Sequence, residues 1–161
     1  MLKKSKLSLL IVGLSLLIAI FTLVLPTIYF EGNKTVIMGW ITTFGGVIKD
    51  YNGSNINIGL SVGGLINFIL PLVAGVLVYF FGKSQRSTYF IVSLIFIANI
   101  VLTLFTKTFF MNVNIGGSII GAQSAVLSAG PYVCVSLSGI ACIASLVGLF
   151  YKPNARLNKK Y

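Results

Sequence analysis

Four long apolar stretches, separated by short polar segments, dominate this chain. They cover about residues 7–25, 60–81, 88–105 and 131–151, and each is near the roughly 20 residues that a helix needs to cross a bilayer. The chain is 57% hydrophobic and only 9% charged, whereas a soluble domain carries roughly a quarter charged residues. The pattern predicts an all-α membrane protein: a single four-transmembrane-helix bundle over residues 1–161.

The first stretch resembles a secretory signal, because Lys3, Lys4 and Lys6 precede it. Its apolar core is longer than the roughly 7–15 residues of a signal peptide, and no A-x-A cleavage site follows it. We therefore expect a retained anchor helix that ends near Pro26.

Basic residues are distributed unequally between the two sets of flanks. Nine lie on one set (Lys3, Lys4, Lys6, Lys83, Arg86, Lys152, Arg156, Lys159, Lys160), and three lie on the other (Lys34, Lys49, Lys107). Because basic flanks stay in the cytoplasm, both termini and the turn at 82–87 are expected there. Residues 26–59 and 106–130 then form outer loops of a multi-pass protein of the cell membrane.

The net charge of +10 would indicate a nucleic-acid partner in a soluble protein. Here the charge lies in the short segments between apolar stretches, so no nucleic acid is expected. The partners that the charge predicts are anionic lipid headgroups at the cytoplasmic face.

The chain lacks most of the side chains that catalysis uses. It has no histidine, and its only acidic residues are Glu31 and Asp50. Paired-carboxylate catalysis, histidine triads and the usual zinc sites are therefore excluded. Cys134 and Cys142 lie in the fourth stretch, ~12 Å apart along a helix, which is too far for a disulfide. We expect no enzyme, cofactor or metal, and buried small-residue roles for both cysteines.

The first outer loop has the pattern of a small antiparallel sheet. Residues 35–44 are rich in β-branched and aromatic side chains, residues 47–51 follow a glycine pair, and residues 55–58 alternate polar with apolar. Asn52-Gly53 is the signal of a two-residue type I′ hairpin turn. The prediction is a small extracellular β-sheet formed by the outer loops.

Residues 36–44 also fit a second interpretation, an amphipathic helix lying in the membrane interface. Trp40 suits both structures, as an outer-loop anchor at the interface or as a plug between sheet and bundle.

The second outer loop begins with residues 108–115, which fit one more strand of the same sheet. Residues 119–128 are small and moderately apolar. They fit a short helix or a re-entrant segment that dips into the bilayer, and re-entry needs protein or water around the backbone.

Small residues mark two stretches for close helix packing. The second stretch has Gly59, Gly63 and Gly64 near its start, and the fourth repeats Gly130, Cys134, Ser138 and Cys142 every four residues, with Ala141 and Ser145 beside them. Small side chains let membrane helices approach closely. These two stretches are therefore predicted to form the tightest pair.

Asn67 and Asn99 are the most polar residues deep within the stretches. Counted from the cytoplasmic ends at ~1.5 Å per residue, both reach a similar depth. We expect a hydrogen bond between the second and third helices; lining of a polar pathway is the alternative. Pro71, midway along the second stretch, removes a backbone donor and predicts a kink.

The layout resembles the claudin-like four-span family over the whole chain. Gly39-Trp40 resembles part of that family's first-loop Gly-Leu-Trp element, without its Leu, and Gly130-Pro131-Tyr132-Val133 resembles the entry to its fourth span. The resemblance implies a left-handed four-helix bundle capped by an extracellular sheet. That family's first loop carries a disulfide pair, but here no cysteine lies outside a span, so paracellular sealing is not implied.

These features are compatible with three classes of function, in decreasing order. The first is a non-catalytic membrane protein acting by contact with a second copy or another membrane protein, through its outer loops or helix faces. The second is a small channel or transporter, or an accessory subunit of one, working as an oligomer. The third, a membrane enzyme, ranks last because the chain lacks acids, histidines and a Cys-x-x-Cys pair.

Overall fold

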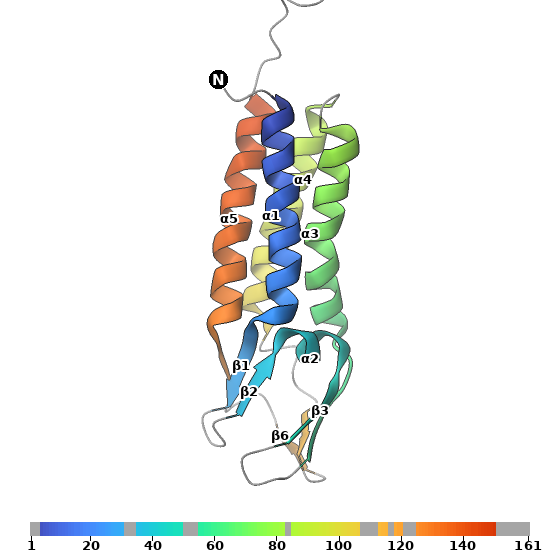
Figure 1. Ribbon diagram of the computed structural model, residues 1–161, viewed down its shortest axis with the longest axis vertical. Coiled ribbons are helices and arrows are strands. Elements are labelled where there is room, and N and C mark those ends of the chain that lie inside the picture. The colour runs from blue at the N-terminus through green and yellow to red at the C-terminus, as the bar shows by residue number, and fades with distance from the viewer. Residues whose placement is uncertain are drawn as a thin grey trace, which may run out of the picture.

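The computed structural model describes residues 4–30, 35–49, 55–82, 85–106, 113–115, 118–120 and 125–150. Four long helices run along the long axis of the molecule, and the strands lie together at one end (Figure 1). The long helices are α1 (Lys4–Val24), α3 (Val62–Phe81), α4 (Ser87–Leu104) and α5 (Ala129–Phe150). All four are long and apolar enough to cross a membrane, and they agree closely with the predicted stretches.

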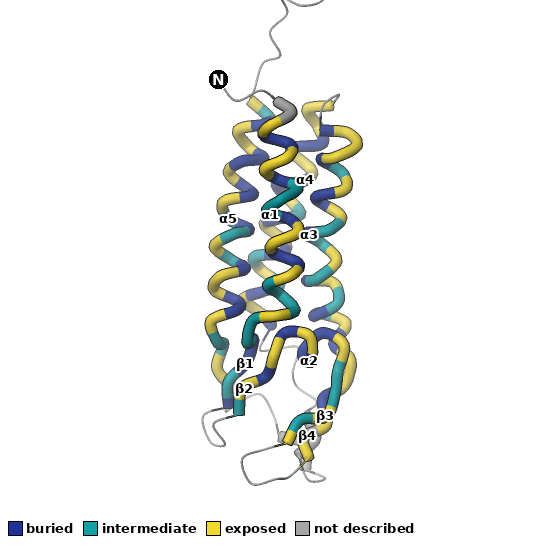
Figure 2. The backbone as a smooth tube through the Cα atoms, viewed as in Figure 1, coloured by how far each residue is buried: buried dark blue, intermediate teal, exposed yellow. Residues whose placement is uncertain are grey.

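The bundle shows the burial pattern that a hydrocarbon solvent selects. Large apolar side chains are exposed on all four long helices, among them Leu9, Phe80, Phe90, Ile143 and Phe150, and exposed positions recur along the helices in Figure 2. Small polar side chains lie inside, beside an apolar core: Ser8, Ser15, Ser93, Asn99, Thr103, Ser138 and Ser145 are all buried. Polar groups avoid lipid and seek one another, so this arrangement is that of a multi-pass membrane protein.

The helices form a ring in which α1 contacts α3, α3 contacts α4, α4 contacts α5, and α5 contacts α1. The predicted tight pair of the second and fourth stretches, now α3 and α5, is wrong. These helices lie on a diagonal of the ring, because each helix takes its sequence neighbours as packing neighbours. Glycine at position 75 instead packs on α1, where an added Cβ would lie 3.0 Å from the Cβ of Ser15.

In the described part of the chain, seven short strands and one short helix form the other end. The elements are β1 (Pro26–Phe30), β2 (Thr35–Met38), α2 (Gly39–Phe44), β3 (Gly46–Lys49), β4 (Asn55–Ile58), β5 (Val113–Ile115), β6 (Ser118–Ile120) and β7 (Ala125–Leu127). They make two sheets, of order β2-β1-β7 and β3-β4-β5-β6. Both loops contribute to each sheet, so the single predicted sheet is replaced by two. We call these strands together with α2 the head.

The stretch of residues 35–44 combines the two structures that were expected as alternatives. Residues 35–38 form β2, and residues 39–44 form α2. The strand ends where Gly39 permits a close approach: a Cβ there would collide with the Thr22 carbonyl group of α1. The Gly39 amide donates to the Leu25 carbonyl (3.0 Å), so the residue that follows α1 satisfies the start of α2.

The strands β3 and β4 pair as the predicted antiparallel hairpin. A regular ladder on a two-residue turn at Asn52-Gly53 would pair Lys49 with Ile56, whereas Lys49 pairs with Asn55. The type I′ turn stays a prediction. The turn residues themselves lie outside the described part of the chain.

The second loop confirms one expectation and overturns another. Residues 113–115 form β5, which pairs with β4 as the predicted extra strand. Residues 119–128 form neither a helix nor a re-entrant segment where they are described: β6 pairs with β5, and β7 pairs with β1. Strand edges left open by the first loop offer these residues backbone partners, which satisfies them better than a short isolated helix would.

The head has an apolar core of its own. Ile28, Phe30, Ile37, Ile41 and Ile58 are buried together, with Ile48 packed against them. They come from β1, β2, α2 and β4, so both sheets and the helix share one centre. Burial of such side chains stabilises by about 1.5–3 kcal/mol each, which holds the head together without a disulfide.

The helix order can be tested by crosslinking. Ser15→Cys/Gly75→Cys, in a background with Cys134 and Cys142 replaced by alanine, should form an intramolecular disulfide on mild oxidation. The expected Cβ positions are within a small adjustment of the about 3.5–4.5 Å that a disulfide needs. Gel mobility before and after reduction measures the bond.

The matched control pairs Ser15→Cys with Val73→Cys, whose site on α3 faces outward. It should stay reduced under the same conditions. Equal crosslinking of both pairs, or none in the first, would contradict the helix order.

Candidate functional site

Four polar side chains meet inside the bundle and form what we call the asparagine cluster: Asn67 of α3, Asn99 and Thr103 of α4, and Ser138 of α5. Asn99 and Ser138 are fully buried, and Asn67 is 6% exposed. Each comes from a helix position that faces the centre of the ring. The cluster joins three of the four long helices.

Asn99 is the centre of the cluster. Its Nδ2 donates to Asn67 Oδ1 at 2.7 Å, which is the predicted hydrogen bond between the second and third helices. The same Nδ2 donates to the backbone carbonyl of Asn67 at 2.9 Å, and Asn99 Oδ1 accepts from the Ser138 hydroxyl at 2.8 Å. Thr103 lies 3.0 Å from Asn67 Oδ1. Both Nδ2 hydrogens and one of the two Oδ1 lone pairs of Asn99 are thus used.

The second donation by Asn99 has a cause in the sequence. A helical carbonyl normally accepts from the amide four residues later, and four residues after Asn67 stands Pro71, which has no N–H. The Asn67 carbonyl is therefore free, and Asn99 Nδ2 occupies it. Pro71 is buried within α3, so its structural role here is to release an acceptor for a neighbouring helix.

This geometry also sets the orientation of the Asn99 amide. If the amide were turned over, its oxygen would face two oxygens of Asn67, and its nitrogen would face the Ser138 hydroxyl.

The cluster contains no titratable group, so it offers hydrogen bonding and no proton transfer. It acts as a polar clamp inside a low-dielectric bundle.

The predicted packing residues lie against other partners than expected. Gly64 packs on α2, where an added Cβ would lie 3.0 Å from the Thr42 carbonyl oxygen. Gly59 lies before α3 and has no atom near its Cβ position, and Gly63 is half-buried in the first turn of α3. None of the three mediates a contact with α5, because the glycine-rich start of α3 faces the head.

The small residues of α5 face α4 in part and the α1 side in part. Cys142 Sγ lies 3.7 Å from the Ser93 carbonyl, and Ser138 contacts Asn99. Ser145 is fully buried and donates to the Ala141 carbonyl of its own helix. Cys134 lies 3.6 Å from the Thr22 hydroxyl. Both cysteines are buried and free of disulfides, as expected of small packing residues.

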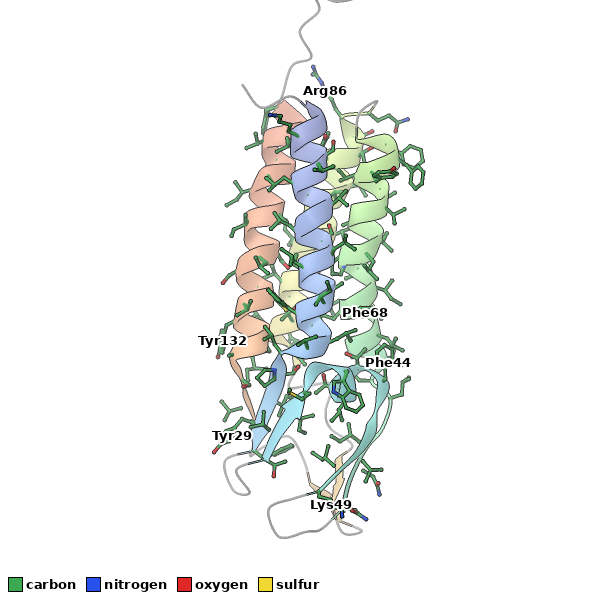
Figure 3. The ribbon with its side chains drawn as sticks, viewed as in Figure 1. Tyr29, Phe44, Lys49, Phe68, Arg86 and Tyr132 are labelled. Carbon is green, nitrogen blue, oxygen red and sulfur yellow. The ribbon has the colours of Figure 1, made fainter. Side chains whose placement is uncertain are left out.

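Trp40 lies on α2, with its side chain 52% exposed, so the plug interpretation is wrong. The short helix buries Ile41, Thr42 and Thr43 and turns its aromatic residues outward. Phe44 packs edge-on against Phe68 of α3, with ring centroids 6.1 Å apart (Figure 3). The interface-anchor role of Trp40 agrees with this exposure and stays a prediction.

Among the described residues, no group of three His, Cys, Asp or Glu side chains is placed to hold a metal ion. A scan against protein-family models finds no match, and searches of curated proteins and of solved structures find none either. The resemblance to claudin-like proteins therefore stays a prediction.

Sequence reasoning found the two asparagines but not Thr103, and it gave Ser138 a packing role only. A signal for the fuller cluster was present: Thr103 stands one helical turn after Asn99, and Pro71 stands one turn after Asn67. Ser138 could not be placed, because its partner depends on which helix α5 faces.

The hydrogen bonds of the asparagine cluster predict that substitutions at Asn99 and Pro71 have coupled effects on the free energy of unfolding. Asn99→Leu should lower the free energy of unfolding by about 1–3 kcal/mol, because it leaves the Asn67 carbonyl without a donor. In a Pro71→Ala background the loss should be smaller, since an alanine at this position supplies the missing N–H. Unfolding by SDS titration in mixed micelles measures all four corners of the cycle.

The control is Ser136→Ala, which removes an exposed hydroxyl bonded within its own helix. Its effect should be small and additive with Pro71→Ala. An Asn99→Leu loss that is the same in both backgrounds would contradict the role given to Pro71.

Proposed function

We propose that this protein acts in the cell membrane by contact with other proteins, without catalysis, and that the contact surface is the head. The observation that carries the proposal is the joint construction of the head. Each of the two sheets contains strands from both loops, and the first-loop elements of both sheets share one apolar core. A rigid folded head is the kind of surface that recognition needs, whereas loops that only connect helices have no reason to interlock.

Within the head, β2 is the edge that suits a partner best. Among the described strands, it pairs with β1 alone. Val36 and Met38 point outward, 48% and 40% exposed, on either side of the buried Ile37. An edge strand offers unpaired backbone groups, and two apolar side chains beside it add area to bury. The partner is a second copy of this chain or another membrane protein.

The interior of the bundle gives transport less support. The asparagine cluster uses its polar groups on itself, and the layers along the axis are filled by large buried side chains, including Tyr89, Phe96, Ile11 and Ile18. Among the described residues, no ionisable Asp, Glu, Lys or Arg lies inside the ring. Coupled transporters place such groups at membrane depth.

The proposed orientation puts the head outside the cell and both termini in the cytoplasm. Its support is the excess of basic residues at the end opposite the head. Arg86 and Lys49 lie at opposite ends of the molecule (Figure 3). Each basic residue near anionic headgroups stabilises the contact with the membrane surface by about 1 kcal/mol. This favours the orientation in which the flanks with nine basic residues face the cytoplasmic leaflet.

Orientation is tested with single cysteines in the cysteine-free background. On intact cells, a membrane-impermeant maleimide should label Val47→Cys, in the head, and should leave Gln85→Cys unlabelled until the cells are permeabilised. Both positions are exposed, so access to the reagent is the only difference expected. The reverse labelling would overturn the proposed topology.

The contact function is tested by crosslinking in native membranes. A partner should be recovered with the full-length protein in mild detergent, and Val36→Lys/Met38→Lys should lower its recovery by at least about tenfold, because an interface that loses ~1.4 kcal/mol loses a factor of ten. Val47→Lys, on the other sheet, is the matched control and should keep the partner.

Two results would count against the proposal. One is unchanged recovery with the β2 variant when the helices remain folded by circular dichroism. The other is solute flux through liposomes that contain only the purified protein, which would favour the channel alternative.

A further inference from the structure

A small cavity lies where the bundle meets the head. Its volume is about 20 Å³, and every helix contributes to its wall. The polar residues of the wall are six threonines, one asparagine and one cysteine: Thr22, Thr27, Thr42, Thr43, Thr103, Thr106, Asn67 and Cys134. The presence of so many hydroxyl groups around one small space needs an explanation, because apolar side chains would fill that space at a lower desolvation cost.

The hydroxyl hydrogens of the wall threonines are already used within the protein. Five are directed at backbone carbonyls: Thr22 to Ile18 at 2.8 Å, Thr43 to Gly39 at 2.9 Å and Thr106 to Leu102 at 3.3 Å are examples, and Thr27 and Thr42 do the same. The one hydrogen of Thr103 has two acceptors within reach, the Asn99 carbonyl at 2.7 Å and Asn67 Oδ1 at 3.0 Å. A hydroxyl that donates still has lone pairs, so a hydroxyl oxygen that borders the cavity can accept from a ligand there.

The wall also has one donor that is not used. Asn67 is 6% exposed, and its Oδ1 accepts from Asn99 and Thr103. Its Nδ2 makes no hydrogen bond to any described residue, yet it is not among the fully enclosed atoms without a partner. Asn67 itself lines the cavity, which is thus a space adjoining its side chain. An N–H that is largely shielded from water is unfavourable without a partner, and a ligand in the cavity would supply one.

We propose that this cavity binds one ordered water molecule. The water accepts a hydrogen bond from Asn67 Nδ2 and donates its two hydrogens to threonine oxygens of the wall. The volume suits this ligand, because a buried water needs roughly 10–15 Å³ and two to four polar partners. The water joins the asparagine cluster to Thr43 of α2, and so ties the head to the bundle beyond what apolar packing does.

A monovalent cation fits the site less well. Oxygen acceptors would suit it, but the Asn67 amide directs positive hydrogens into the same space, and the described wall carries no carboxylate. Burying a bare charge without a counter-charge is expensive. A water molecule can both accept from the Asn67 amide and donate to the threonine oxygens of the wall.

The test is a crystal structure of the full-length protein grown in a lipid mesophase, with rubidium as the only alkali cation. The expected result is a peak within ~2.7–3.2 Å of Asn67 Nδ2, without rubidium anomalous signal. Thr43→Val/Thr106→Val, which removes two acceptors at nearly constant shape, should lose the peak. Thr88→Val changes a buried threonine outside the cavity and should keep it.

Three results would overturn the proposal. The first is an empty cavity in the unmodified protein, which decides the matter even if the double variant does not fold. The second is a rubidium anomalous peak at the site. The third is a water that persists unchanged in Thr43→Val/Thr106→Val, because the threonines would then not hold it.

Discussion

The hydrogen bonds between Asn99 and Asn67 depend on a constraint that governs the whole molecule: inside hydrocarbon, a polar group has only other protein groups as partners. Pro71 leaves one backbone carbonyl of α3 without its helical donor, and a neighbouring helix supplies one. Once α4 is fixed in this way, the Ser138 hydroxyl of α5 donates a hydrogen bond to the Asn99 amide oxygen. The depth and facing of three helices thus follow from one missing N–H.

The same constraint explains how the bundle and the head are joined. α2 begins against the end of α1, through the Gly39 amide and the Leu25 carbonyl, and it lies over the start of α3 at Gly64. Side chains that face this junction are threonines, which satisfy themselves on their own backbone and remain able to accept. The junction therefore combines close backbone contact with polar surface, and the head is positioned by the helices that carry it.

Much of the architecture could be read from residues near one another in the chain. Helix lengths follow from apolar runs, and the facing of Asn67 and Asn99 follows from equal depth on consecutive helices joined by a short turn. Which helices pack side by side could not be predicted in this way. The small residues of α3 and α5 are real packing positions. However, their spacing predicts only which face of a helix packs closely, and it does not predict which other helix packs on that face. Strand pairing has the same property, since β4 pairs with both β3 and β5 and its position is shared between two partners.

The amino-acid sequence by itself determined the solvent, the number and limits of the spans, and the depth of each polar residue, because these depend on composition and on the fixed rise of a helix. Only the tertiary structure decided the ring order, the division of the strands into two sheets, and the wall of the threonine cavity. These depend on which distant segments meet, and many pairings of similar apolar surfaces have similar energies until polar groups such as Asn99 and Ser138 select one.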